Sequence, residues 1–187
     1  MNYKPIIVVA GEPNSIFLEI FFKSIDKNKY KSPIILIASK NLLNKQMKKL
    51  NFNFEINLIN KKNITFVKIN NKKINLIDVH LQFNKIFDKI SDKSNSYINE
   101  CFEIALEILT KNKCSGLING PISKKTFLKE RYLGITEYLA EKTKRKNKVA
   151  MLIFNKKLSV SPITTHLPLK EVHKNLTIKK IINNTRL

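Results

Sequence analysis

Two stretches of the sequence share one order, a short apolar run followed by a segment with helical periodicity. Residues 5–10 (Pro-Ile-Ile-Val-Val-Ala) and 33–38 are continuous apolar runs, typical of strands buried on both faces. A helical pattern over residues 16–25 follows the first run, and one over residues 41–50 follows the second. Successive strand-helix units predict a parallel sheet flanked by helices, which is an α/β fold.

Each of these two predicted helices has an apolar face. In the first, Ile16, Ile20 and Phe21 are expected to face inward. In the second, Ser39 is expected to cap the N-terminus. The expected inward face of the second helix consists of Leu42, Leu43, Met47 and Leu50.

The middle of the chain combines short strands with one long helix. Residues 54–59, 64–69 and 73–79 are predicted to be strands separated by Asn-Lys turns, forming a meander or a flap at one edge of the sheet. Residues 94–111 carry the clearest helical pattern in the chain, with Cys101 on the apolar side. Cys101 is therefore interpreted as a core thiol.

The last third predicts a site at the edge of the sheet. A short strand over residues 116–119 precedes a helix that Ser123 can cap. Residues 149–154 and 158–163 predict a hairpin, whose second strand carries Thr164, Thr165 and His166 to its carboxyl end. Ligands usually bind at that end of an α/β sheet. The predicted C-terminal elements are a short helix over residues 169–175 and another helix that Thr177 can cap.

Composition and charge narrow the class of protein. The 187 residues are 43% apolar, and no apolar run approaches the roughly 20 residues that a membrane helix requires. The N-terminus leads directly into a strand, which argues against a signal peptide. Two cysteines without metal-ligand spacing indicate a reduced protein, and the cytoplasm is the expected location. No membrane partner is expected.

The formal charge of +21 would attract any polyanion. The lysines are nevertheless scattered through predicted helices, turns and loops instead of being gathered in one basic helix or interleaved with aromatic residues. No specific nucleic-acid partner is therefore expected.

The polar motifs are weak signals when each is taken alone. His166 by itself is better interpreted as a hydrogen-bonded residue, since zinc normally needs three or four protein ligands. Thr136 and Glu137 by themselves fit a helix N-terminus with an acidic first turn. His80 and His173 have no partner at ligand spacing and are interpreted as surface residues.

Several motifs occur together in the order of one known family. They are Gly11-Glu12-Pro13, Asn119-Gly120-Pro121-Ile122-Ser123-Lys124, Gly134-Ile135-Thr136-Glu137-Tyr138-Leu139-Ala140-Glu141 and Thr164-Thr165-His166-Leu167-Pro168-Leu169-Lys170. In this combination the chain resembles the 4-hydroxythreonine-4-phosphate dehydrogenase family of pyridoxal phosphate biosynthesis. The resemblance runs from Ile6 to about Thr177 and covers a little over half of a full family member.

The resemblance implies a truncated three-layer α/β/α fold similar to isocitrate and isopropylmalate dehydrogenases. Residues 1–115 would be the N-terminal part of a first domain, and residues 116–187 the incomplete start of a second. The family oxidises 4-phosphohydroxy-L-threonine with NAD, and the β-keto acid produced loses carbon dioxide. A homodimer is also implied.

Site residues follow from the same resemblance. His166 corresponds to the first of three histidines that bind a divalent metal (zinc, magnesium or cobalt), and the other two would lie beyond Leu187. Thr136 corresponds to a threonine that contacts the substrate. Ile135 stands where the family has a substrate-binding histidine. The loop after the first strand also departs from the family, with Asn14, Ser15 and Phe17 in place of further glycines.

Three hypotheses remain open at this point. The chain is the N-terminal portion of a dehydrogenase of this family, or a relative acting on another phosphorylated hydroxy acid, such as a four-carbon sugar-acid phosphate. Ile135 favours that second hypothesis. The third is a non-catalytic product, either a truncated copy or a basic polyanion-binding protein. For the isolated chain we predict weak binding of divalent metal and no measurable dehydrogenase turnover.

Overall fold

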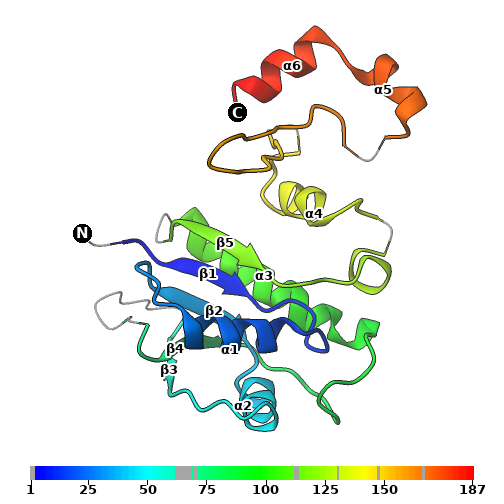
Figure 1. Ribbon diagram of the computed structural model, residues 1–187. Coiled ribbons are helices and arrows are strands. Elements are labelled where there is room, and N and C mark those ends of the chain that lie inside the picture. Colours follow the sequence, from blue (N-terminus) through cyan, green and yellow to red (C-terminus); the bar gives the residue numbers. More distant parts are fainter. Residues whose placement is uncertain are drawn as a thin grey trace. The chain divides into compact units, whose positions relative to one another are not determined.

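The computed structural model describes residues 3–61, 69, 71–111, 114–129, 131–146, 148–165 and 167–187. The chain divides into two compact units, Met1–Phe127 and Leu128–Leu187. Figure 1 shows the elements of both units in the order of the chain.

A five-stranded parallel sheet forms the centre of the first unit. Its spatial order is β3-β4-β2-β1-β5, and every pairing between neighbours is parallel. Ile6 of β1 pairs with Ile34 of β2 on one side and with Gly116 of β5 on the other. The strands are β1 (Ile6–Val9), β2 (Ile34–Ala38), β3 (Ile56–Leu58), β4 (Ile74–Asp78) and β5 (Gly116–Asn119).

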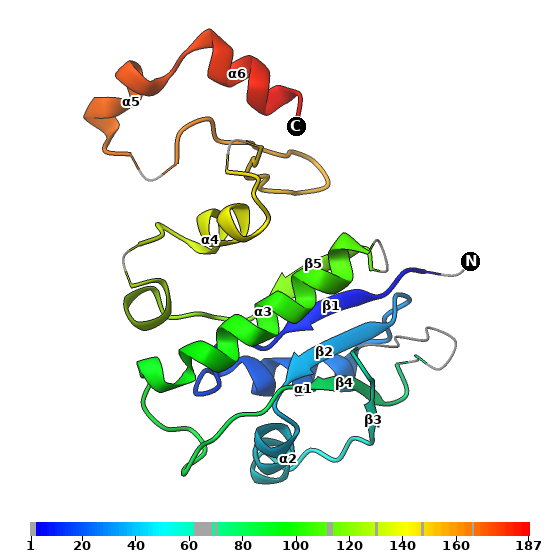
Figure 2. The ribbon, with the colours of Figure 1, turned by 180° about the vertical axis from the view of Figure 1, so that it is seen from behind.

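Helices cover both faces of this sheet, which makes three layers. Helices α1 (Phe17–Lys27) and α2 (Lys40–Lys49) share one core with the sheet. Helix α3 (Asn95–Thr110) covers the opposite face, as the front and back views show together (Figures 1 and 2). The predicted α/β/α architecture is therefore confirmed for this unit.

The core on the α1 face is rich in aromatic side chains. Phe22 is fully buried, and its ring centroid lies 5.4 Å from that of Phe52 and 6.1 Å from that of Phe54. Leu36 and Leu76 of the sheet pack into the same cluster. Burying a side chain of this size contributes roughly 1.5–3 kcal/mol, so Phe22 is a major contributor to the stability of this layer.

Helix α3 buries the residues that its periodicity predicts. Ile98, Cys101 and Phe102 are all inaccessible to solvent. The hydroxyl of Tyr97 accepts a hydrogen bond of 3.1 Å from the backbone N–H of Ser39, which joins α3 to the end of β2. Ser39 in turn caps α2, since its hydroxyl accepts from the N–H of Leu42, as predicted.

The second unit consists of short helices and extended segments. Thr177 caps the last helix by accepting from the N–H of Lys180, as predicted. Many apolar side chains of this unit are exposed, among them Phe154 at 75% and Leu169 at 88%. The helices are α4 (Ile135–Lys142), α5 (Leu169–Asn175) and α6 (Ile178–Thr185).

Two short turns complete the element order. The 3-10 turn η2 (Asp92–Ser94) leads directly into α3. The π-helical turn η3 (Lys124–Leu128) follows β5, and the hydroxyl of Ser123 accepts from the N–H of Thr126 at its start. The predicted capping role of Ser123 is thus confirmed.

The expected meander at the sheet edge is wrong. β3 and β4 run parallel to each other, and β4 lies inside the sheet between β3 and β2. The reason lies in β4 itself, where four consecutive residues from Ile74 to Ile77 are buried. Burial of every residue is typical of an inner parallel strand. Most of the predicted strand 64–69 lies outside the described residues.

The predicted inward face of the first helix is also partly wrong. Phe21 is buried as expected, but Ile16 is 65% exposed and Ile20 is 52% exposed. The buried residues are Leu18, Phe21 and Phe22. This register buries two aromatic rings, and it removes more apolar surface from water than burial of the isoleucines would.

The two strands predicted over residues 149–163 are wrong. The predicted hairpin is reduced to one antiparallel bridge between Ile153 and Val160, with backbone hydrogen bonds of 2.8 and 2.9 Å. The side chains around this bridge are exposed, so no apolar face forces a longer pairing. The division between the two compact units lies after Phe127, and β5 belongs to the first unit because it pairs with β1.

Candidate functional site

Two glycines interlock the loops that follow β1 and β5. Gly11 has a φ of +74°, and a Cβ atom there would overlap the carbonyl oxygen of Pro121. A Cβ at Gly120 would overlap the carbonyl of Ala10. The N–H of Glu12 donates to the Pro121 carbonyl at 2.8 Å. These contacts need glycine at both positions and fix the backbone at the carboxyl ends of β1 and β5.

Glu12 is a buried carboxylate at this edge of the sheet. Only 2% of its surface is exposed. Its Oε1 accepts from the N–H of Asn14 at 3.3 Å, and its Oε2 lies 3.1 Å from the hydroxyl of Ser94. Burial raises the pKa of Glu12 above its ordinary 4.5, and the hydrogen bonds from Asn14 and Ser94 offset part of that effect.

The N-terminus of α4 carries the two residues predicted to face the substrate. Ile135 and Thr136 are the first two residues of the helix, and both are half-buried. Gly134 occupies the N-cap without a side-chain cap, and the first turn carries Glu137. The Thr136 hydroxyl makes no hydrogen bond to any other residue that the structure describes, so it is free to bind an anionic group near the helix N-terminus.

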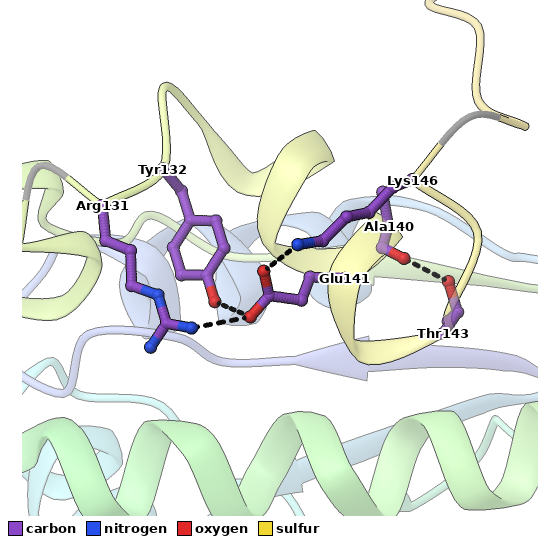
Figure 3. A network of polar contacts seen from close by, with 6 residues as sticks. All are labelled: Arg131, Tyr132, Ala140, Glu141, Thr143 and Lys146. Atoms are coloured by element: carbon purple, nitrogen blue, oxygen red, sulfur yellow. Dashed lines mark hydrogen bonds and ion pairs between the residues drawn. The ribbon is translucent and has the colours of Figure 1, made fainter.

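A second carboxylate organises the other end of α4. Glu141 Oε1 accepts from Arg131 Nη2 at 3.0 Å and from the hydroxyl of Tyr132 at 2.5 Å, while Lys146 Nζ lies 2.7 Å from Oε2 (Figure 3). The Tyr132 ring also packs edge-on against Tyr138, with centroids 5.6 Å apart. The segment that leads into Gly134 is thereby attached to the helix that begins there.

These contacts shift the pKa values of Glu141 and Tyr132. The hydrogen bond from Lys146, followed by that from Tyr132, lowers the pKa of Glu141 to about 2. The hydrogen bond to Glu141 raises the pKa of the Tyr132 phenol above 10.0. Glu141 therefore stays ionised and Tyr132 stays protonated near neutral pH, which suits a structural role in holding α4.

His166, the predicted metal ligand, lies outside the described residues. Its neighbours Thr164 and Thr165 are half-buried, and Pro168 forms the N-cap of α5. Within the described residues, no group of three His, Cys, Asp or Glu side chains is placed to hold a metal ion. The part of the chain that the structure describes therefore does not form a metal site by itself.

The remaining histidines and the cysteines have simple environments. His80 and His173 are exposed, which confirms their interpretation as surface residues. Cys101 and Cys114 are both free thiols and both buried. Burial raises the pKa of Cys101 to about 12, so its thiolate form is negligible at neutral pH and it is a core residue, as predicted.

Sequence reasoning missed the polar contacts that hold both loops. Asn14, noted only as a departure from the family pattern, accepts from the N–H of Asp88 at 3.0 Å. Glu12 was part of a quoted motif, but its contact with Ser94 spans 82 positions and no local pattern indicates it. For Glu141, the nearby Arg131 and Lys146 were a usable signal, because these two basic residues flank the carboxylate in sequence.

The fold and the loop geometry define the class of protein. A parallel sheet with a tight glycine loop at its carboxyl edge is typical of α/β proteins that bind small molecules there. Solved structures share this fold. The chain matches a 4-hydroxythreonine-4-phosphate dehydrogenase from Burkholderia phymatum with a TM-score of 0.85 and 18% identity, over 98% of this chain and 56% of that one. A putative 4-hydroxythreonine-4-phosphate dehydrogenase from Salmonella typhimurium matches with a TM-score of 0.85 and 21% identity, over 98% of this chain and 58% of that one.

Sequence comparison then gives the family. The model of the pyridoxal phosphate biosynthetic protein PdxA matches residues 29–187, and the chain belongs to this family. A 4-hydroxythreonine-4-phosphate dehydrogenase from Sulfurihydrogenibium sp. is 34% identical over 96% of this chain and 55% of its own length. One from Wigglesworthia glossinidia brevipalpis is 29% identical over 95% of this chain and 54% of its own length. The chain thus spans about half the length of the curated relatives it matches.

These matches confirm the predicted family and its isocitrate dehydrogenase-like fold. Among the described residues no helix has both the length and the apolar character needed to cross a membrane.

Proposed function

We propose that this chain provides the N-terminal part of an enzyme that oxidises 4-phosphohydroxy-L-threonine with NAD in pyridoxal phosphate biosynthesis. The observation that carries the proposal is the family match over residues 29–187, together with 34% identity to a relative named 4-hydroxythreonine-4-phosphate dehydrogenase. In the reaction, hydride passes from the secondary alcohol to NAD, the hydroxyl proton is released, and the β-keto acid formed loses carbon dioxide.

Thr136 is the residue of this chain that we assign to the substrate. Its hydroxyl is half-buried at the start of α4, and it donates to the phosphate or carboxylate of the ligand. The adjacent helix N-terminus favours the same negative charge. Glu141 acts indirectly, since its bonds to Arg131 and Tyr132 attach the preceding segment to the helix.

We assign His166 as one ligand of a divalent metal such as zinc, magnesium or cobalt. The proposal rests on the Thr164-Thr165-His166 motif. By the family resemblance, the remaining ligands belong to the part of the family protein that this chain does not span. What this chain contributes to that site is one neutral imidazole beside two hydroxyls.

The domain organisation, the oligomeric state and the cellular location that the family resemblance implies are part of the same proposal. Residues 1–115 are the N-terminal part of a first domain and residues 116–187 the start of a second. The many exposed apolar side chains of the compact unit Leu128–Leu187 support an incomplete second domain. The complete enzyme is a homodimer of the cytoplasm. The two free cysteines support a reducing location.

Ile135 favours a second candidate function, oxidation of another phosphorylated hydroxy acid, such as a four-carbon sugar-acid phosphate. An isoleucine cannot donate the hydrogen bond that the family histidine supplies. A substrate group left without a partner there costs roughly 1–3 kcal/mol. A substrate that lacks this group loses nothing at Ile135.

The test is reconstitution with the missing part. We would co-express residues 1–187 with the remaining part of the Sulfurihydrogenibium protein and measure NADH formation with added divalent metal on both candidate substrates. We expect turnover by the complex and none by the 187-residue chain alone. Ile135→His should raise turnover of 4-phosphohydroxy-L-threonine by about tenfold, as expected for a restored hydrogen bond.

A matched pair of threonines tests the substrate assignment. Thr136→Val should lower kcat/KM by about tenfold or more. Thr143→Val should leave it unchanged, since the Thr143 hydroxyl bonds the Leu139 carbonyl at the other end of α4. Equal effects of the two substitutions would refute the role of Thr136. Turnover by the chain alone would refute the view that it is only part of the enzyme.

A further inference from the structure

A cavity of about 470 Å³ lies within the first unit. Its wall includes Pro13 and Asn14 from the loop after β1, Leu42 from α2, and Leu81, which follows β4. These residues follow the carboxyl ends of three parallel strands, where α/β proteins bind ligands. The volume falls within the roughly 300–1,000 Å³ of small-molecule sites. Neither its position nor its size depends on Thr136 or His166.

The wall of this cavity is held in place by long-range hydrogen bonds. The Asn14 carboxamide accepts from the N–H of Asp88 at 3.0 Å and donates to the carbonyl of Lys89 at 3.5 Å. The hydroxyl of Ser94, another wall residue, forms a hydrogen bond with the carboxyl group of Glu12. The two sides of the cavity are thus joined before any ligand binds, and this reduces the ordering cost of binding.

The cavity is strongly basic. Lys85, Lys89 and Lys93 line it, and none of them forms an ion pair with any residue in the described parts of the chain. Asp88 is the acidic residue among the lining, and its Oδ1 already accepts from the backbone N–H of Lys89 at 2.8 Å. Helix α3, which is 16 residues long, begins beside the cavity without a side-chain cap from Ser94. Its N-terminal dipole adds to the positive potential.

We propose that this cavity binds a small molecule that carries phosphate groups, held by Lys85, Lys89 and Lys93. Phosphate matches the wall better than a carboxylate, because it has more charge and more acceptor oxygens for three ammonium groups. The partly buried ring of Phe83 also lines the cavity and offers an apolar surface for the organic part of such a molecule. This proposal is independent of the dehydrogenase reaction, since it needs neither Thr136 nor a metal.

The test must separate this cavity from the general charge of the chain, which is +21. We would titrate the 187-residue protein with inorganic pyrophosphate by calorimetry at roughly 0.15 M ionic strength, where interactions between exposed charges more than about 8 Å apart are largely screened. The variant Lys85→Ala/Lys89→Ala/Lys93→Ala removes three cavity charges. The matched control Lys27→Ala/Lys29→Ala/Lys31→Ala removes three exposed charges that do not line the cavity.

We expect the Kd for pyrophosphate to rise at least about tenfold in the cavity variant and to stay within about twofold in the control. Asn14→Ala, which removes no charge, should weaken binding by about threefold or more, because it loosens the wall. Equal losses in the two triple variants would overturn the proposal, as would the absence of binding by the wild-type protein. Circular dichroism of each variant checks the fold, and Lys89→Gln alone replaces the triple variant if that protein unfolds.

A parallel titration with ADP identifies the source of the phosphate groups. Tighter binding of ADP than of pyrophosphate supports a nucleotide that uses Phe83 as well as the lysines. Equal or weaker binding of ADP supports recognition of the phosphate groups alone. ADP that binds without competing with pyrophosphate would overturn the assignment of both to this cavity.

Discussion

Oε2 of Glu12 lies 3.1 Å from the hydroxyl oxygen of Ser94, although 82 positions separate the two residues in the sequence. The same hydroxyl lies 3.0 Å from the carbonyl oxygen of Ser91. A hydroxyl has one proton and cannot donate to both oxygens at once. When Glu12 is protonated, it donates to Ser94 and Ser94 donates to Ser91, so the protonated acid satisfies all three groups.

The first prediction concerns this pair. The pKa of Glu12 is raised by burial, so the folded state binds its proton more tightly than the unfolded state. The stability that this contributes is complete below the ordinary value of 4.5 and is lost as the pH rises through the folded-state pKa. Glu12→Gln mimics the protonated acid and should unfold at an equal or higher temperature near neutral pH, with weaker pH dependence just above 4.5.

Thermal unfolding across this pH range measures the effect. Ser94→Ala is the matched comparison, because it removes the partner and should cost about 1–3 kcal/mol. A Glu12→Gln protein that is clearly less stable than wild type near neutral pH would show that the ionised carboxylate is required.

The second prediction concerns the crossing of the two loops. Gly120→Ala places a methyl group on the Ala10 carbonyl and the Phe17 ring, so it should lower the free energy of unfolding by about 1–3 kcal/mol. Gly116→Ala is the control, since nothing lies within 4 Å of a Cβ at that position. Chemical denaturation of both variants checks the difference, and equal midpoints would mean that the loops are not packed as described.

The third prediction tests which face of α1 is buried. Phe22→Ala should cost about 3–5 kcal/mol, because it empties a site between Phe52 and Phe54. Ile20→Ala on the same helix should change stability by about 0.5 kcal/mol or less, since that side chain is 52% exposed. Urea denaturation measures the free energy of unfolding of both variants. A larger loss of stability at Ile20 than at Phe22 would show that the face expected from the sequence is the buried one.

The fourth prediction concerns Glu141. Lys146→Met removes the strongest influence on this carboxyl, so the pKa of Glu141 should rise from about 2 toward 4.5. A lowered carboxyl pKa contributes stability above the unfolded value, and that contribution is lost as the pH falls toward about 2. Carbon-detected NMR titration reports the pKa directly. Lys148→Met is the control. It also removes one positive charge, but Lys148 makes no contact with Glu141 among those described, so the pKa of Glu141 should stay at about 2.

Local patterns were sufficient to predict most of the first unit. Continuous apolar runs predict β1 and β2, and helical periodicity predicts α3, because these signals depend only on residues close in sequence. The order of the strands was not available in this way. The position of β4 next to β2, and of β5 next to β1, depends on pairing between distant segments.

In the candidate site too, features with local sequence signals were predicted and long-range contacts were not. Thr136 and Glu137 were placed correctly at a helix start, since an acidic first turn is a local signal. The substrate role of Thr136 came from resemblance to a family and not from the residues alone. The bond between Glu12 and Ser94, and that between Asn14 and Asp88, could not be predicted, because each joins loops more than seventy positions apart.

The pairing of β1 with β5 sets a minimum length for this unit during synthesis. The hydroxyl of Ser115 donates to the carbonyl of Lys4, 111 positions earlier. Until β5 has left the ribosome, the nascent chain has an open hydrogen-bonding edge along β1, and such an edge is prone to pair with other chains. Closure over so long a separation is intrinsically slow.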